Sequence, residues 1–168
     1  MVHLSAPLGS HGKKVVGDAN GTWPEAVDWS CLSYPLGPHL TVGDLLHFDT
    51  RRSLAAKESE TALLALASQY NQIRAAWNGP ICVTAAFCPE PFNRQVCGCA
   101  DSLHAQGLAL DLVPLDDSVD HFHSWLSKRW SGGLGRRAES VSIDLRWKGC
   151  FSKKGNLTPA KRWSECLL

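Results

Sequence analysis

His104 and Asp111 lie close together in the middle of the chain, and both residue types can bind a metal ion. An imidazole nitrogen and a carboxylate oxygen are common zinc ligands. Two ligands do not complete a catalytic site, because such a zinc ion takes about three protein ligands and keeps one position open for water. The pair therefore indicates a zinc site only if a third ligand comes from elsewhere in the chain.

The segment 108–113 has leucine at every second position, which predicts a strand with one leucine face. Asp111 falls between the leucines, so its side chain should point to the opposite face. His104 falls in the polar loop before this strand. We expect the side chains of His104 and Asp111 to lie within reach of one common point.

Two further strands are expected, over residues 81–87 and 140–145. The second of these alternates Val, Ile and Leu with polar residues, which places Ser142 and Asp144 on its polar face. We expect all three strands to share one sheet, with Ser142 lining the same cavity as Asp111.

Helices should back this sheet. Residues 59–77 carry apolar side chains at three- and four-residue spacings, which predicts a long helix with one buried stripe. Thr41 and Ser118 are suited to cap two shorter helices. The predicted fold class is α+β, a small mainly antiparallel sheet backed by helices.

The chain divides by composition into three parts. Residues 1–38 lack a sustained period and should form an irregular arm, with Trp23 and Trp29 as its anchors. Residues 39–150 should form the single domain, and residues 151–168 a tail.

The segment from Thr84 to Asp111 resembles, without a gap, a motif of the zinc D-alanyl-D-alanine carboxypeptidases and related phage endolysins, T-S-G-Y-R-P-P-x-V-N-R-x-V-G-G-x-x-x-S-x-H-x-x-G-x-A-x-D. The resemblance covers about residues 40–147, including a glycine-rich turn at 132–135. It implies the fold that these enzymes share with the hedgehog signalling domain. It also implies that His104 and Asp111 are the first two zinc ligands.

Three departures from the family pattern fall at chemically important positions. Ser142 stands where the family has the histidine that is its third zinc ligand, and a serine hydroxyl is a poor ligand beside imidazole. Cys88 replaces an arginine expected to hold negative charge of substrate or transition state. Cys97 replaces a glycine. Ser142→His is therefore expected to complete a three-ligand zinc site.

Other residues could compensate for the missing ligand. His121 or His123 could turn toward the site, and thiolates bind zinc well, so the cysteines mapped near the loop are candidates too: Cys88, Cys97 and Cys99.

The resemblance also points to residues around the metal position. Glu139 and Asp144 are candidate general bases, although a glutamate beside Arg136 and Arg137 is also typical of a surface ion pair. The cleft should be lined by residues of the motif loop and its start: Cys88, Asn93, Arg94 and Ser102.

Two functions remain open. An active protein would cleave peptidoglycan stem peptides or their precursors near a D-amino acid, as a carboxypeptidase or an endopeptidase, with a zinc-bound water as the attacking group. An inactive protein would bind cell-wall peptides with the same cleft, or serve as a scaffold in a phage particle or similar assembly.

Composition excludes other classes. The net charge of the 168 residues is +1, and the run Arg136-Arg137 is typical of a solvated surface, so a nucleic-acid partner has no electrostatic support. No segment has the length and apolarity of a membrane span. The first residues lack a signal peptide's apolar core, which favours a cytoplasmic protein or one released by lysis. The seven cysteines are therefore expected to be reduced thiols.

Overall fold

The computed structural model describes residues 26–96, 98–146 and 162–164 of the chain. Its helices are short except for one, and its strands are three to six residues long. In chain order the elements are α1 (Val42–Leu46), the 3-10 helix η1 (Thr50–Arg52), α2 (Ser53–Glu58), α3 (Glu60–Trp77), β1 (Ile81–Ala85), α4 (Phe92–Gln95), β2 (Ala109–Pro114), α5 (Val119–Ser127), β3 (Gly133–Arg136), β4 (Val141–Asp144) and β5 (Arg162–Ser164).

The strands form one sheet in the order β1-β2-β4-β3-β5. The first four strands are antiparallel neighbours, and β5 adds to β3 in parallel. The predicted α+β class and the sharing of one sheet by the three expected strands are confirmed. In this register Asp111 of β2 lies directly opposite Ser142 of β4.

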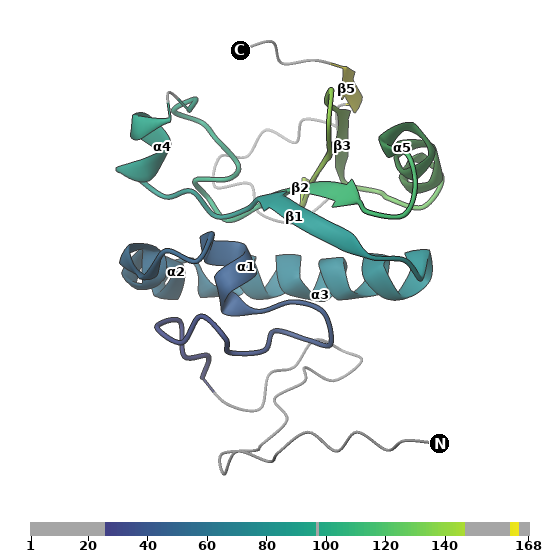
Figure 1. Ribbon diagram of the computed structural model, residues 1–168. Coiled ribbons are helices and arrows are strands. Elements are labelled where there is room, and N and C mark those ends of the chain that lie inside the picture. Colours follow the sequence, from purple (N-terminus) through teal and green to yellow (C-terminus); the bar gives the residue numbers. More distant parts are fainter. Residues whose placement is uncertain (1–25, 97, 147–161, 165–168) are drawn as a thin grey trace, which may run out of the picture.

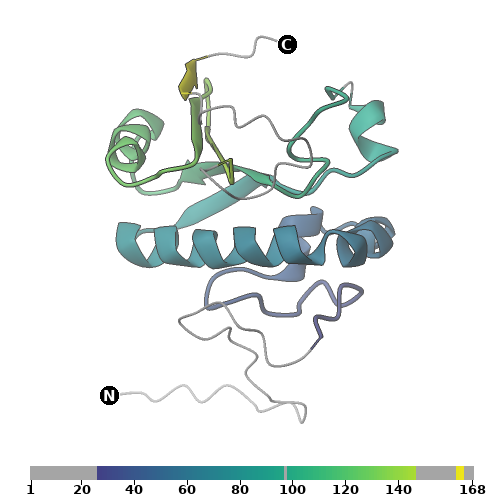
Figure 2. The same cartoon turned by 180° about the vertical axis from the view of Figure 1, so that it is seen from behind.

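Helix α3 runs along one face of the sheet, beneath β1 and β2 (Figure 1), and the view from behind shows it crossing the width of the domain (Figure 2). Helices α4 and α5 lie on the other side of the sheet, toward its two ends. The phenol hydroxyl of Tyr70 in α3 donates a hydrogen bond to the carbonyl of Ile81 at 2.8 Å, which fixes the helix against the first strand.

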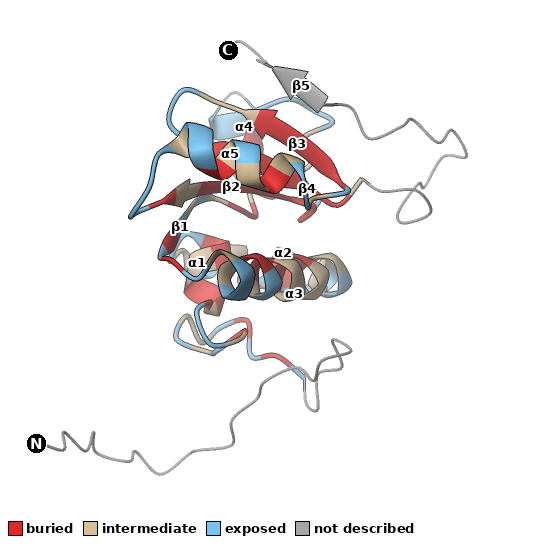
Figure 3. Ribbon diagram, turned by 90° about the vertical axis from the view of Figure 1, so that its right-hand side faces the viewer, coloured by how far each residue is buried: buried red, intermediate tan, exposed pale blue. Residues whose placement is uncertain are grey.

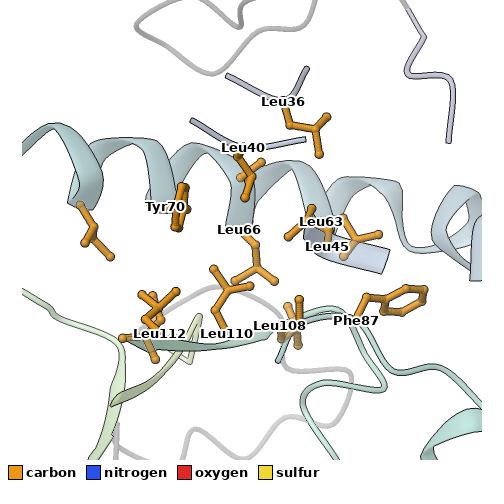
Figure 4. Close-up of a cluster of buried hydrophobic side chains, with 14 of the residues drawn as sticks. Leu36, Leu40, Leu45, Leu63, Leu66, Tyr70, Phe87, Leu108, Leu110 and Leu112 are labelled. Carbon is orange, nitrogen blue, oxygen red and sulfur yellow. The ribbon is translucent and has the colours of Figure 1, made fainter. Parts of the chain in front are cut away.

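The core lies between α3 and the leucine face of β2. Figure 4 shows Leu63 and Leu66 of the helix directed at the leucines of the strand, and Leu110 and Leu112 are fully buried. Burial follows the inner surfaces of both layers, while the outward side of α5 is exposed (Figure 3). The apolar stripe of the long helix thus faces the sheet, as its periodicity predicts.

The segment before α1 packs against the far side of α3. Trp29 is buried, and its indole N–H donates to Glu60 Oε2 at 2.8 Å. The Asn71 side chain donates to the carbonyl of Leu36 at 2.8 Å. Trp29 therefore anchors this irregular segment as expected, whereas Trp23 lies outside the described residues.

The glycine-rich stretch at 132–135 was expected to be a turn, and this prediction is wrong: residues 133–136 are strand β3. The physical reason is the closeness of Asp144. A Cβ on Gly133 would lie 2.1 Å from Asp144 Oδ2, and one on Gly132 would lie 2.1 Å from the Asp144 carbonyl oxygen. Glycine occurs here because the neighbouring strand leaves no room for a side chain, and its low strand propensity hides the strand from sequence.

Candidate functional site

His104 belongs to the connection between α4 and β2, which is folded back onto the end of β1. Its Nδ1 lies 2.9 Å from the carbonyl oxygen of Ala86. A carbonyl can only accept, so Nδ1 donates its proton in this contact, and Nε2 is the ring nitrogen left to face Asp111. The amide of Cys88 donates to the carbonyl of His104 at 3.0 Å, which holds this loop against the segment after β1.

Asp111 lies beside this imidazole on the face of β2 that points away from the leucine core. His104 Nε2 is 3.6 Å from Asp111 Oδ1. Two ligand atoms at zinc-bonding distances of about 2.0–2.2 Å in a tetrahedral arrangement lie at roughly this separation. The structure thus brings the two predicted ligands to one common point.

Ser142 lines the same site from β4, as the strand alternation predicts. Its hydroxyl donates to Asp111 Oδ1 at 2.5 Å, and Ser142 is 4% exposed. The Ser142 hydroxyl therefore occupies one acceptor position of Asp111 Oδ1, the same oxygen that faces His104.

Arg137 completes this network, in a role that no sequence pattern indicates. Its Nε donates to Ser142 Oγ at 2.6 Å and lies 3.6 Å from Asp111 Oδ2. Gly135, the residue directly opposite Ser142 in β3, has no side chain, which leaves room for the arginine to fold over the sheet. Arg136 and Arg137, predicted to be solvated surface, are both partly exposed, and each also has a partner: the Arg137 side chain is 39% exposed and bonds Ser142, while the Arg136 guanidinium pairs with the exposed Asp120 at 2.8 Å.

The network sets the charge of Asp111. Burial by itself raises the pKa of this carboxyl group, but the bonds and charge from His104, the Ser142 hydroxyl and the Arg137 guanidinium outweigh it, so its pKa lies below the ordinary value. Asp111 is therefore a carboxylate at neutral pH.

This lowered pKa predicts an acid-sensitive contribution to stability. A carboxyl group with a lower pKa in the folded than in the unfolded state stabilises the fold above its unfolded value of about 3.9, and the contribution is lost as pH falls through the folded pKa. Asp111→Asn should therefore lower the free energy of unfolding at pH 7, and the deficit should narrow below about pH 4. Urea unfolding between pH 7 and pH 3 measures this; a deficit that does not change with pH would contradict it. Asp120→Asn, at an exposed carboxylate, is the matched control.

The candidate bases lie apart from this network. Asp144 is 3% exposed, and its carboxylate accepts from the amides of Gly133 and Arg146 and from the Arg146 guanidinium, the last at 2.7 Å. Glu139 is exposed in the connection between β3 and β4. Their catalytic roles stay predictions.

The four predicted cleft residues have different positions. Asn93 is buried and donates to Glu90 Oε1 and to the carbonyl of Cys99, so it shapes the loop. Ser102 donates its backbone N–H to the same carbonyl at 3.0 Å. The Arg94 side chain is 82% exposed and lies 3.6 Å from Glu90 Oε2, while Cys88 is half-buried beside His104.

Of the compensating ligands proposed from sequence, Cys88 lies beside His104 but is not grouped with it and Asp111 as a metal site. His121 pairs with Asp117 at 2.6 Å and packs its ring against Trp77 at the other end of the sheet. Cys99 is exposed, and Cys97 lies outside the described residues. Within residues 26–96, 98–146 and 162–164, no three His, Cys, Asp or Glu side chains are grouped to hold a metal ion.

His47 is a second residue near the site that sequence reasoning missed. Its Nε2 accepts a hydrogen bond from the amide of Ala86 at 3.1 Å, on the residue whose carbonyl binds His104. Loss of solvent, then the charges of Arg52 and His104, lower the pKa of His47, which favours the neutral ring that this bond requires. His47 and Phe48 both have left-handed backbone angles, with φ of 52° and 53°, and the sequence carries no signal for this turn.

The comparison with protein families agrees with this fold. The model of the family described as Peptidase M15 matches residues 38–145, and the chain belongs to this family of zinc D-alanyl-D-alanine carboxypeptidase-like peptidases. The search of curated proteins found no match. No helix in the described part of the chain is long and apolar enough to cross a membrane.

Zinc is the metal on which this family generally depends, but the donor set here does not fit a three-ligand zinc site. The predicted ligands His104 and Asp111 offer two ligand atoms, and Ser142, predicted to stand at the third ligand position, offers a hydroxyl already bonded to Asp111. The guanidinium of Arg137 lies against the same carboxylate. The positive Arg137 side chain thus lies beside Oδ2 of Asp111, while His104 lies beside Oδ1.

Proposed function

We propose that this chain binds peptidoglycan stem peptides that carry D-amino acids, and that it does so without zinc-dependent hydrolysis. The observation that supports the proposal is the position of Ser142, which lies where the family motif has its third zinc ligand and is hydrogen-bonded to both Asp111 and Arg137. Membership of the Peptidase M15 family supports peptidoglycan peptides as the ligand class.

Electrostatics favours a metal-free site. Two unit charges 4 Å apart interact by roughly 4 kcal/mol at an effective dielectric constant of about 20, and a divalent ion doubles this value. A zinc ion between His104 and Asp111 would meet such repulsion from Arg137 unless the guanidinium moved away. It would also gain only a weak ligand in Ser142.

The position of Cys88 supports the same conclusion. Peptide hydrolysis develops negative charge on the attacked carbonyl oxygen, and removing one preorganised donor to such a charge typically lowers kcat by about 10²–10³-fold. The half-buried Cys88 side chain supplies no positive charge there, as a cysteine never carries one. Ligand loss and arginine loss therefore reduce catalysis through independent routes.

A zinc hydrolase is the second candidate, and one observation favours it. The Nδ1–H of His104 donates to a backbone carbonyl while Nε2 faces Asp111, and zinc-binding histidines are held in this way by a partner on their other nitrogen. This arrangement preserves two ligands of a metal site.

Peptide binding and cleavage can be measured together on the full chain. N-acetyl-L-Lys-D-Ala-D-Ala should bind with unchanged affinity in EDTA and in added zinc, and no D-alanine should be released in either solution. The same peptide with two L-alanines should bind more weakly. Zinc-dependent release of D-alanine would favour the hydrolase, and a failure of the D-peptide to bind would reject the proposed function.

A further inference from the structure

The guanidinium of Arg137 is fixed through only one of its nitrogens. Nε donates to Ser142 Oγ, and Ser142 in turn donates to Asp111. The two terminal nitrogens make no hydrogen bond to the described residues, and the side chain is 39% exposed. Among the described residues nothing occupies these two N–H groups, which belong to a partly exposed side chain at the edge of the site.

In the described part of the chain the neighbours of this pair leave both N–H groups without a hydrogen bond, although the Asp111 carboxylate offsets part of the guanidinium charge. Asp111 lies on the Nε side, 3.6 Å away. Arg136 is turned toward Asp120, and the exposed Glu139 of the same connection forms no ion pair with Arg137. An anion that approaches from solvent therefore meets two N–H donors that no described side chain occupies.

A fork of two parallel N–H donors matches the two oxygens of a carboxylate, and such bidentate pairs are among the strongest hydrogen bonds in proteins. The bond to Ser142 holds the fork in place before a ligand arrives, which lowers the entropy lost on binding. We propose that Arg137 is the anchor for the terminal carboxylate of the bound peptide, in the site where relatives of this chain hold zinc. This inference rests on the proposed function, since it names the part of the peptide that the site recognises.

The experiment compares N-acetyl-L-Lys-D-Ala-D-Ala with its C-terminal amide by calorimetry. On the natural chain the amide should bind more weakly by about tenfold or more, because a charge-assisted bidentate pair is lost. Arg137→Gln should bind the acid as weakly as the amide, and Arg137→Lys, which keeps the charge without the fork, should fall between. Arg136→Gln is the matched control and should keep the full preference for the acid.

The outcomes separate the two proposals. Equal affinity of acid and amide on the natural chain, or an acid preference retained by Arg137→Gln, would overturn the carboxylate anchor while leaving peptide binding in place. If neither peptide binds, both the anchor and the proposed function are overturned. Should Arg137→Gln fail to fold, as judged by thermal unfolding, Arg137→Lys and the comparison on the natural chain decide the question.

Discussion

The double variant Ser142→His with Arg137→Ala should bind zinc tightly, whereas Ser142→His alone should gain much less. The histidine places a third ligand across the strand pair from Asp111, since residues 111 and 142 are directly opposite. The sequence alone predicts that the histidine completes the site. The structure adds that Arg137 must also be removed, because its guanidinium lies against the same carboxylate.

Thermal unfolding with and without zinc measures this effect. A metal that binds only the folded state stabilises it by about 2.7 kcal/mol at a concentration one hundred times Kd. For a chain of this size, that corresponds to a rise in Tm of roughly 5–10 °C. Ser142→Ala with Arg137→Ala removes the same contacts without adding a ligand and should show no zinc-dependent rise. If the variant Ser142→His with Arg137→Ala shows no larger zinc-dependent rise in Tm than this control, our alignment of β4 is refuted.

Leu110→Ala should destabilise the fold by about 2–5 kcal/mol, a large part of the 5–15 kcal/mol typical of a domain. Leu110 is fully buried between β2 and α3, so truncation loses apolar burial and leaves a cavity. Urea unfolding measures the loss. Leu115→Ala is the control, because this side chain is 64% exposed and its removal should change the free energy of unfolding by less than about 0.5 kcal/mol.

The Leu110 variant also tests how the site is positioned. Leu110 and Asp111 are consecutive residues that point to opposite faces of β2, so the core that holds the strand also fixes the carboxylate. If Leu110→Ala lowers the free energy of unfolding no more than Leu115→Ala does, the sheet does not depend on the packing between β2 and α3.

The polar face of the sheet could be predicted from sequence because alternation is a local property. Leucines at every second position determine the side on which Asp111 lies, and the same rule places Ser142 on the polar face of its own strand. The family resemblance predicted that Ser142 lines the same cavity, and the strand pairing places it opposite Asp111. The long helix over 60–77 could be predicted for a similar reason, since its apolar stripe repeats with the helical period.

Arg137 could not be predicted because its role depends on contacts between strands. Nothing local distinguishes it from Arg136, yet one reaches across Gly135 to Ser142 while the other pairs with Asp120. Strand β3 was hidden for a related reason, because Gly133 at its start is required by Asp144 of the adjacent strand. Interactions of this kind appear only once the pairing of the strands is known.

Zinc calorimetry on the unmodified chain, together with its metal content after exposure to zinc, tests the central claim most directly. We expect no saturable binding at micromolar zinc, because two ligands beside a guanidinium do not hold the ion. Tight binding of one zinc ion per chain, abolished by His104→Ala, would contradict the account. It would show that Arg137 gives way and that another residue completes the metal site.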